Sequence, residues 1–194
     1  MPYPSKIDGQ VILAAAMKEL AAESIRELSL RSIAASLNVA PNAIYRYFPD
    51  RSVLEAALAD ESARRLELAL RRSAKRCDAI TALRRMAAAY IAFARDNPHL
   101  YEVMMSRHSP IHGAACRESV WLFTVSQVQR VVGETRAEDA SVALWAFLHG
   151  AAVLEKGPVF ANKVNGGFDF GLDAWISAIA NPDRTEPFSS VQST

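Results

Sequence analysis

Residues 28–50 read LSLRSIAASLNVAPNAIYRYFPD, and this stretch decides the fold of the first third of the chain. Apolar residues at i, i+3, i+4 and i+7 form one helix face, at Leu30, Ile33, Ala34 and Leu37. Ser29 is placed to cap that helix, and Asn38 can adopt the left-handed conformation that turns the chain. Pro41 suits the first position of a following helix. The pattern predicts two short helices, over 30–37 and 41–48, joined by a tight turn.

The second of these helices has two distinct faces when it is read at about 100° per residue. Ile44 and Phe48 define the inward face. The outward positions are Asn42, Ala43 and Arg46, and the flanking positions are Tyr45 and Tyr47. A helix that reads a DNA major groove needs this layout, with polar groups for base edges at its centre and donors for phosphates on both sides. Arg31 and Arg51 add positive charge on the same side.

The charge distribution places any contact with a polyanion in the same part of the chain. Residues 1–76 carry 12 Lys and Arg against 9 Asp and Glu, a net charge of +3, whereas residues 77–194 carry 10 against 12, a net charge of −2. Cys77 and Cys116 lie far apart, and the N-terminus has no apolar run behind a basic start. These features predict a cytoplasmic protein without a signal peptide. The apolar stretch 140–154 is too short to cross a membrane.

Apolar residues recur at helical spacing along most of the chain, and alternating β-branched strands are missing. The fold class expected is therefore all-α, with about nine helices. Helices outside 28–50 are expected over 8–23, from 51 past 71, and over 79–96, 99–106, 114–132, 137–155 and 168–180. We expect a three-helix DNA-binding domain over 1–52, a larger helical domain over 53–181, and a disordered tail over 182–194.

An ordinary helical bundle with two incidental tyrosines is the alternative interpretation of residues 28–50. The run LSLRSIAASLNVAPNAIYRYFPDR, preceded by ILAAAMKELAAES, resembles the DNA-binding domain of the TetR family of transcriptional regulators. The resemblance implies phosphate contacts at Tyr45, Tyr47, Arg31 and Arg51, and sequence-dependent contacts at Asn42, Ala43 and Arg46. Two positions depart from the family pattern. Ser24 stands where glycine is common, and Ala40 stands where a capping serine or threonine is common.

The C-terminal part also carries a resemblance. LWAFLHGAAVLE, with NPHLYEVMMS, resembles the TetR subgroup named for a Trp-His-Gly signature. The resemblance implies a small-molecule effector pocket within the larger domain. Candidate lining residues are Met86, Tyr90, Phe93, Tyr101, Met104, Trp121, Trp145 and His149. Trp145 and His149 share a helix face. The alternative is that these residues are plain core. No dense charged cluster marks this part, which favours an apolar or neutral effector.

Two further kinds of site were weighed from the sequence. His108, His112 and Cys116 repeat every four residues, but Pro110 and Gly113 interrupt a shared helix face. Because zinc needs four ligands in firm geometry, we expect a solvated loop and no metal. The sequence contains no GxSxG, HExxH or glycine-rich phosphate loop, so we expect neither an enzyme nor a bound cofactor.

The last two long helices hold more apolar residues than one small core readily buries. The resemblance implies that they pair with their symmetry mates in a homodimer. Two recognition helices would then read a palindromic double-stranded operator, with half-sites about 34–36 Å apart or a multiple of that. The function expected is a repressor that a small-molecule effector releases from DNA. The alternative is a helical small-molecule binding protein without operator binding.

Overall fold

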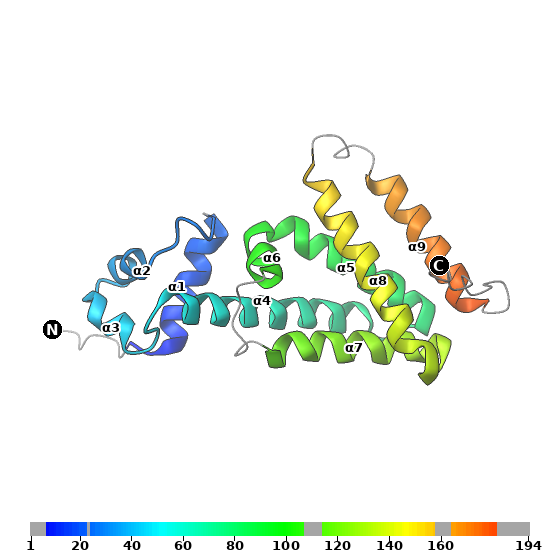
Figure 1. The fold of residues 1–194 in the computed structure, drawn as a ribbon, viewed down its shortest axis with the longest axis horizontal. Helices are drawn as coiled ribbons and strands as arrows, with labels where there is room; N and C mark the ends of the chain where they lie inside the picture. The colour runs from blue at the N-terminus through cyan, green and yellow to red at the C-terminus, as the bar shows by residue number, and fades with distance from the viewer. Residues whose placement is uncertain (1–6, 23, 107–113, 158–163, 182–194) are drawn as a thin grey trace, which may run out of the picture. The chain divides into compact units, whose positions relative to one another are not determined.

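The computed structural model describes residues 7–22, 24–106, 114–157 and 164–181. Over these residues the chain forms nine helices and no strand (Figure 1). The helices are α1 (Gly9–Ala22), α2 (Leu30–Ser36), α3 (Pro41–Tyr45), α4 (Arg51–Ser73), α5 (Ala79–Asp96), α6 (Pro98–Met105), α7 (Ala114–Val132), α8 (Glu134–Glu155) and α9 (Val164–Ala180). The expected all-α fold is confirmed. No helix in the described ranges is long and apolar enough to cross a membrane.

The helices fall into two compact units. The first comprises Met1–Arg71 and Ala92–Leu122, and the second comprises Arg72–Ile91 and Phe123–Thr194. Helices α1, α2, α3 and α6 belong to the first unit, and α8 and α9 belong to the second. The domain boundaries expected from the sequence stay a prediction. The tail over 182–194 lies outside the described residues.

Three helix boundaries differ from those expected, each for a local physical reason. Helix α3 ends at Tyr45 and not at Phe48, because Pro49 disfavours helical backbone in the residue before it. Helix α8 begins at Glu134, directly after Gly133, whose φ of 77° favours glycine. Helix α9 begins at Val164, four residues earlier than expected, so that two glycines that read as a helix breaker lie inside the helix.

In the first unit, α1 lies against both α2 and α6, and α2 lies against α3. Their shared core consists of fully or nearly fully buried side chains, among them Ile12, Leu20, Ile33, Ile44 and Leu100. Each of these side chains comes from the apolar face of its helix. Burying one such side chain contributes about 1.5–3 kcal/mol. The core therefore fixes the orientation of the short helices α2 and α3, which could not be stable alone.

In the second unit, α8 and α9 lie side by side (Figure 1). The rings of Phe147 on α8 and Phe168 on α9 stack with centroids 5.7 Å apart and planes 17° apart. Gly171 faces this stack, and a Cβ atom at that position would lie 2.4 Å from Cε2 of Phe147. Gly171 therefore permits an approach of the two helices that any larger residue would prevent.

We expect Gly171→Ala to destabilise the α8–α9 pair by about 1–3 kcal/mol, because the added methyl group overlaps the ring of Phe147. The matched control is Gly167→Ala on the same helix, where a Cβ atom would meet nothing within 4 Å. That control should be neutral or stabilising, since alanine favours a helix by about 1 kcal/mol over glycine. Denaturant unfolding of both variants measures the difference. Equal midpoints for the two variants would contradict the predicted clash.

Candidate nucleic-acid interface

Helix α2 begins with a reciprocal cap. The Ser29 hydroxyl accepts a 3.0 Å hydrogen bond from the Ser32 amide, and the Ser32 hydroxyl accepts a 3.2 Å bond from the Ser29 amide. The cap at Ser29 expected from the sequence is confirmed. The carboxylate of Glu19 on α1 accepts a further bond of 2.8 Å from the Ser32 hydroxyl. This contact links the start of α2 to α1.

The turn between α2 and α3 has the geometry that the sequence predicts. Asn38 has a φ of 53°, in the left-handed region that asparagine tolerates better than most residues. The Val39 amide donates to the Ala34 carbonyl at 3.0 Å, which closes the end of α2. Ala40 precedes α3 without a side-chain cap, and Pro41 occupies the first turn. The turn thus directs α3 across α2.

Helix α3 presents polar side chains outward and anchors itself with apolar ones. Ile44 is fully buried and Phe48 is 7% exposed, which confirms the inward face expected from the sequence. Asn42 and Arg46 are exposed, and Ala43 is half-buried. Tyr45 and Tyr47 are 41% and 40% exposed and lie on either side of the helix. The arrangement can offer an amide and a guanidinium to base edges, and two phenol hydroxyls to phosphates.

The Tyr47 hydroxyl already has a partner. It donates a 3.0 Å hydrogen bond to the carbonyl of Ile7, just before α1. A Cβ atom at Gly9 would meet the Tyr47 ring at 3.7 Å, so the ring lies along the start of α1. Tyr47 therefore ties the first turn of α1 to the end of α3. A phosphate would have to share this hydroxyl with Ile7 or replace it.

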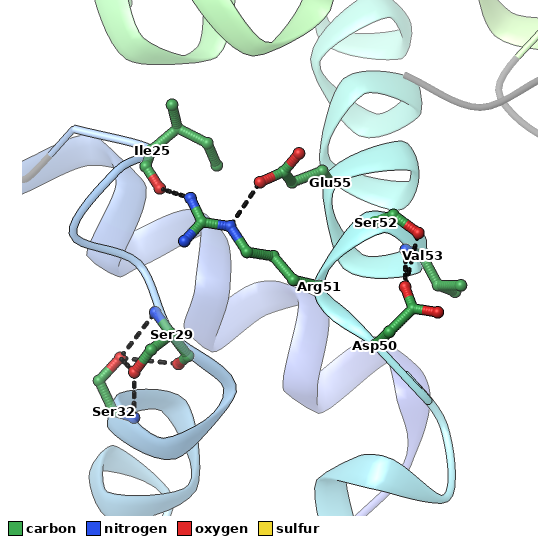
Figure 2. Close-up of polar contacts among 8 residues, drawn as sticks. All are labelled: Ile25, Ser29, Ser32, Asp50, Arg51, Ser52, Val53 and Glu55. Atoms are coloured by element: carbon green, nitrogen blue, oxygen red, sulfur yellow. Dashed lines mark hydrogen bonds and ion pairs between the residues drawn. The ribbon is translucent and has the colours of Figure 1, made fainter. Parts of the chain in front are cut away.

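The start of α4 carries two arrangements that the sequence did not predict (Figure 2). Asp50 caps the helix, because its carboxylate accepts bonds from the Ser52 hydroxyl at 2.6 Å and from the Val53 amide at 3.0 Å. These bonds hold the pKa of the Asp50 carboxyl below its usual value. The Arg51 guanidinium bonds to the Ile25 carbonyl and to Glu55. Arg31 is exposed in the first turn of α2.

The predicted effector residues are divided between the two compact units. Phe93, Tyr101, Met104 and Trp121 lie in the first, and Met86, Tyr90, Trp145 and His149 lie in the second. Within the second unit, Tyr90 and Trp145 meet edge to face with ring centroids 5.7 Å apart. Five of the eight are buried, and Trp121, Trp145 and His149 are half-buried. Burial of this kind fits both a packed core and a lined pocket, so their effector role stays a prediction.

A half-buried carboxylate on α4 is a feature that sequence periodicity did not reveal. Oδ1 of Asp60 is buried, and no hydrogen-bond partner for it lies among the described residues. Burial raises the pKa of Asp60, and the positive charge of Arg117 offsets part of that rise. Burial also raises the pKa of the Cys116 thiol, with the carboxylates of Asp60 and Glu67 adding to the effect. A thiol that stays protonated is a poor metal ligand.

Metal binding finds no support in the described ranges. They contain no group of three or more His, Cys, Asp or Glu side chains that could hold an ion. His108 and His112, which the sequence pattern pairs with Cys116, lie outside the described residues.

We expect Asp60→Asn to stabilise the protein at neutral pH. The raised pKa means that the folded protein binds this proton more tightly than the unfolded chain, so ionisation of Asp60 costs folding free energy. The cost is present above the folded-state pKa and is lost as the pH falls to the unfolded value, near 3.9. Denaturant midpoints of the wild type and the variant should therefore differ at pH 7 and converge near pH 3.5. A gap that is unchanged by pH would contradict this origin.

A capped helix, a left-handed turn and an exposed helix carrying Asn42 and Arg46 together form a helix-turn-helix of the kind that DNA-binding regulators use. The sequence model "Bacterial regulatory proteins, tetR family" matches residues 12–58, which span this motif. The model "Tetracyclin repressor-like, C-terminal domain" matches residues 83–175. The chain belongs to the TetR family: it is a DNA-binding transcriptional regulator with a ligand-binding C-terminal domain.

Solved structures share this fold over most of their length. A protein of unknown function from Rhodococcus sp. RHA1 is 25% identical, with a TM-score of 0.78 over 91% of this chain and 98% of that chain. A variant of TetR from Acinetobacter baumannii AYE in complex with minocycline is 20% identical, with a TM-score of 0.66 over 93% and 100%. A tetR-family regulatory protein from Rhodococcus RHA1 is 19% identical, with a TM-score of 0.63 over 88% and 95%.

Proposed function

We propose that the protein is a homodimeric repressor that leaves a palindromic operator when a small molecule binds its C-terminal domain. The observation that carries this proposal is the exposed face of α3, where Asn42 and Arg46 project while Ile44 is fully buried. We assign base contacts to Asn42, Ala43 and Arg46. Phosphate contacts fall to the flanking tyrosines Tyr45 and Tyr47 and to Arg31. Since its operator is chromosomal, the protein acts in the cytoplasm.

The homodimer is proposed from the surface of α8 and α9. Val142 and Val153 on α8 are 57% and 51% exposed, and Phe170 on α9 is 78% exposed. Val142 and Val153 lie eleven residues apart, close to three helical turns, and so share one face of α8. Exposed apolar side chains on two adjacent helices are typical of an interaction surface. A second copy of the same pair would cover them in a four-helix interface and set two reading helices in register with a palindrome.

The effector proposed is an apolar or neutral small molecule. The candidate lining is aromatic and methionine-rich, as is common in ligand pockets. Its side chains are buried or half-buried. TetR from Acinetobacter baumannii AYE, a structural relative, is known with minocycline bound, which supports a small-molecule ligand for this fold. TetR family regulators are generally non-enzymatic, and we extend that to this chain. The effector releases DNA only through its different affinities for the two conformations.

The test is a titration of a labelled DNA fragment taken from next to the protein's own gene, at several salt concentrations. Specific binding should exceed binding to a scrambled fragment by a factor of at least about 10³. Affinity should fall steeply as salt rises, because phosphate contacts release counterions. A scrambled fragment of equal length and composition is the control. Equally weak binding to both fragments would contradict the proposal and would favour a small-molecule binding protein without operator binding.

A further inference from the structure

The guanidinium of Arg51 lies between two acceptors on different segments (Figure 2). Its Nη2 donates to the Ile25 carbonyl at 2.5 Å, and its Nε donates to Oε1 of Glu55 at 2.6 Å. Ile25 belongs to the segment that joins α1 to α2, whereas Glu55 lies one turn further along α4. Arg51 therefore bridges the start of α4 and the chain that leads into α2.

Glu55 changes what Arg51 can offer to DNA. The two side chains form an i, i+4 ion pair, with Arg51 49% and Glu55 22% exposed. A neutral pair releases no counterions when a phosphate approaches, whereas an isolated arginine would. A phosphate seeking Nε would also meet the negative charge of Glu55. The charge and the donor that a phosphate anchor needs are thus already engaged.

The bridge reaches the reading helix through a short length of chain. Ile25 lies four residues before Ser29, the cap of α2, and the turn at Asn38 then leads directly into α3. The Asp50 carboxylate fixes the first turn of α4, from which Arg51 extends. Holding Ile25 against this turn fixes where α2 begins. It thereby sets the direction of α3 relative to α4, all within the first compact unit.

We infer that Arg51 is a positioning residue, which clamps the segment before α2 to the start of α4 and does not anchor a phosphate. Lysine could not replace it. A lysine carries one compact ammonium group, whereas the planar guanidinium directs two donors at fixed angles to two separate acceptors. The inference gives a role in reading DNA, and in that respect it rests on the proposed function.

The first arm of the test uses the DNA-free protein. Arg51→Lys keeps the charge but loses the two-pronged clamp, so hydrogen exchange of the Glu27 and Ser29 amides should become faster. Both amides are held by local bonds, to the Ser24 carbonyl and to the Ser32 hydroxyl. The matched control is Arg65→Lys, the same change in an ion pair with Glu61 that is confined to α4. That control should leave both amides unchanged. Circular dichroism verifies that both variants fold.

The second arm measures operator affinity against salt. For a clamp, Arg51→Lys lowers operator affinity about tenfold, the loss expected for a charged hydrogen bond, and leaves the salt slope unchanged. The double variant Arg51→Gln/Glu55→Gln removes one charge of each sign and should also keep the wild-type slope. A phosphate anchor predicts instead a slope that is smaller by about 0.9 per protomer in the double variant.

Wild-type operator affinity for Arg51→Lys, wild-type exchange for that variant, or the smaller slope for the double variant would each overturn the inference. If the wild type binds no fragment specifically, the proposed function fails. The exchange comparison, which needs no DNA, still decides whether the clamp exists.

Discussion

Phe170→Asp is expected to convert the protein into a monomer and to abolish most operator binding. Phe170 is 78% exposed in the single chain, and burial of such a ring in a dimer would contribute about 1.5–3 kcal/mol per copy. The substitution removes that gain twice and places two carboxylates in an apolar interface. Separated readers lose the advantage of being linked, so operator affinity should fall by about 10²–10⁴-fold. Analytical ultracentrifugation and DNA titration measure the two effects.

The matched control is Leu122→Asp, which makes the same kind of change at another exposed leucine-sized side chain, 58% exposed, on α7. It should leave both the oligomeric state and the operator affinity near wild type. If Phe170→Asp stays dimeric at micromolar concentration, the assignment of the dimer interface to α8 and α9 is wrong. If both variants dissociate, the interface extends to α7.

The second large effect concerns which bases are read. Arg46→Ala should relax the preference at one position in each half-site by about 1–3 kcal/mol, because arginine is the usual bidentate partner of guanine. Tyr47→Ala should instead weaken binding to every sequence by a similar factor. Tyr47 is uncharged, so the salt slope should not change in that variant. Binding measured across a library of half-site variants separates the two patterns.

Tyr47→Phe serves as the control for packing, because it keeps the ring against the start of α1 and removes only the hydroxyl that now binds the Ile7 carbonyl. If the hydroxyl contacts phosphate, this variant should share part of the uniform loss. Unchanged binding by both Arg46→Ala and Tyr47→Ala would show that the outward face of α3 does not meet DNA.

Local sequence signals predicted the reading head well because they act within one or two helical turns. Ser29, Asn38 and Ile44 could be assigned a cap, a left-handed turn and a buried anchor from spacing alone, and the structure has each of them. Such features depend on backbone geometry and on one apolar face, both of which are written in neighbouring residues.

Interactions between distant residues could not be predicted in this way. The Arg51–Ile25 bond joins residues 26 positions apart, and a basic residue at a helix start is equally compatible with a phosphate contact. Helix α9 runs through Gly166 and Gly167, against their intrinsic preference, and its later turns pack against α8. The burial of Asp60 Oδ1 likewise depends on tertiary packing and not on the local pattern.

Helix α3 has only five residues, and no side chain caps its start. Such a helix has almost no stability of its own, so its order is borrowed from the core through Ile44 and Phe48. Inward and outward positions are consequently subject to different constraints. Asn42 and Arg46 can be exchanged to redirect the protein to new operators at little cost to the fold. A smaller side chain at Ile44 would loosen the whole reading surface and blur discrimination among all operators alike.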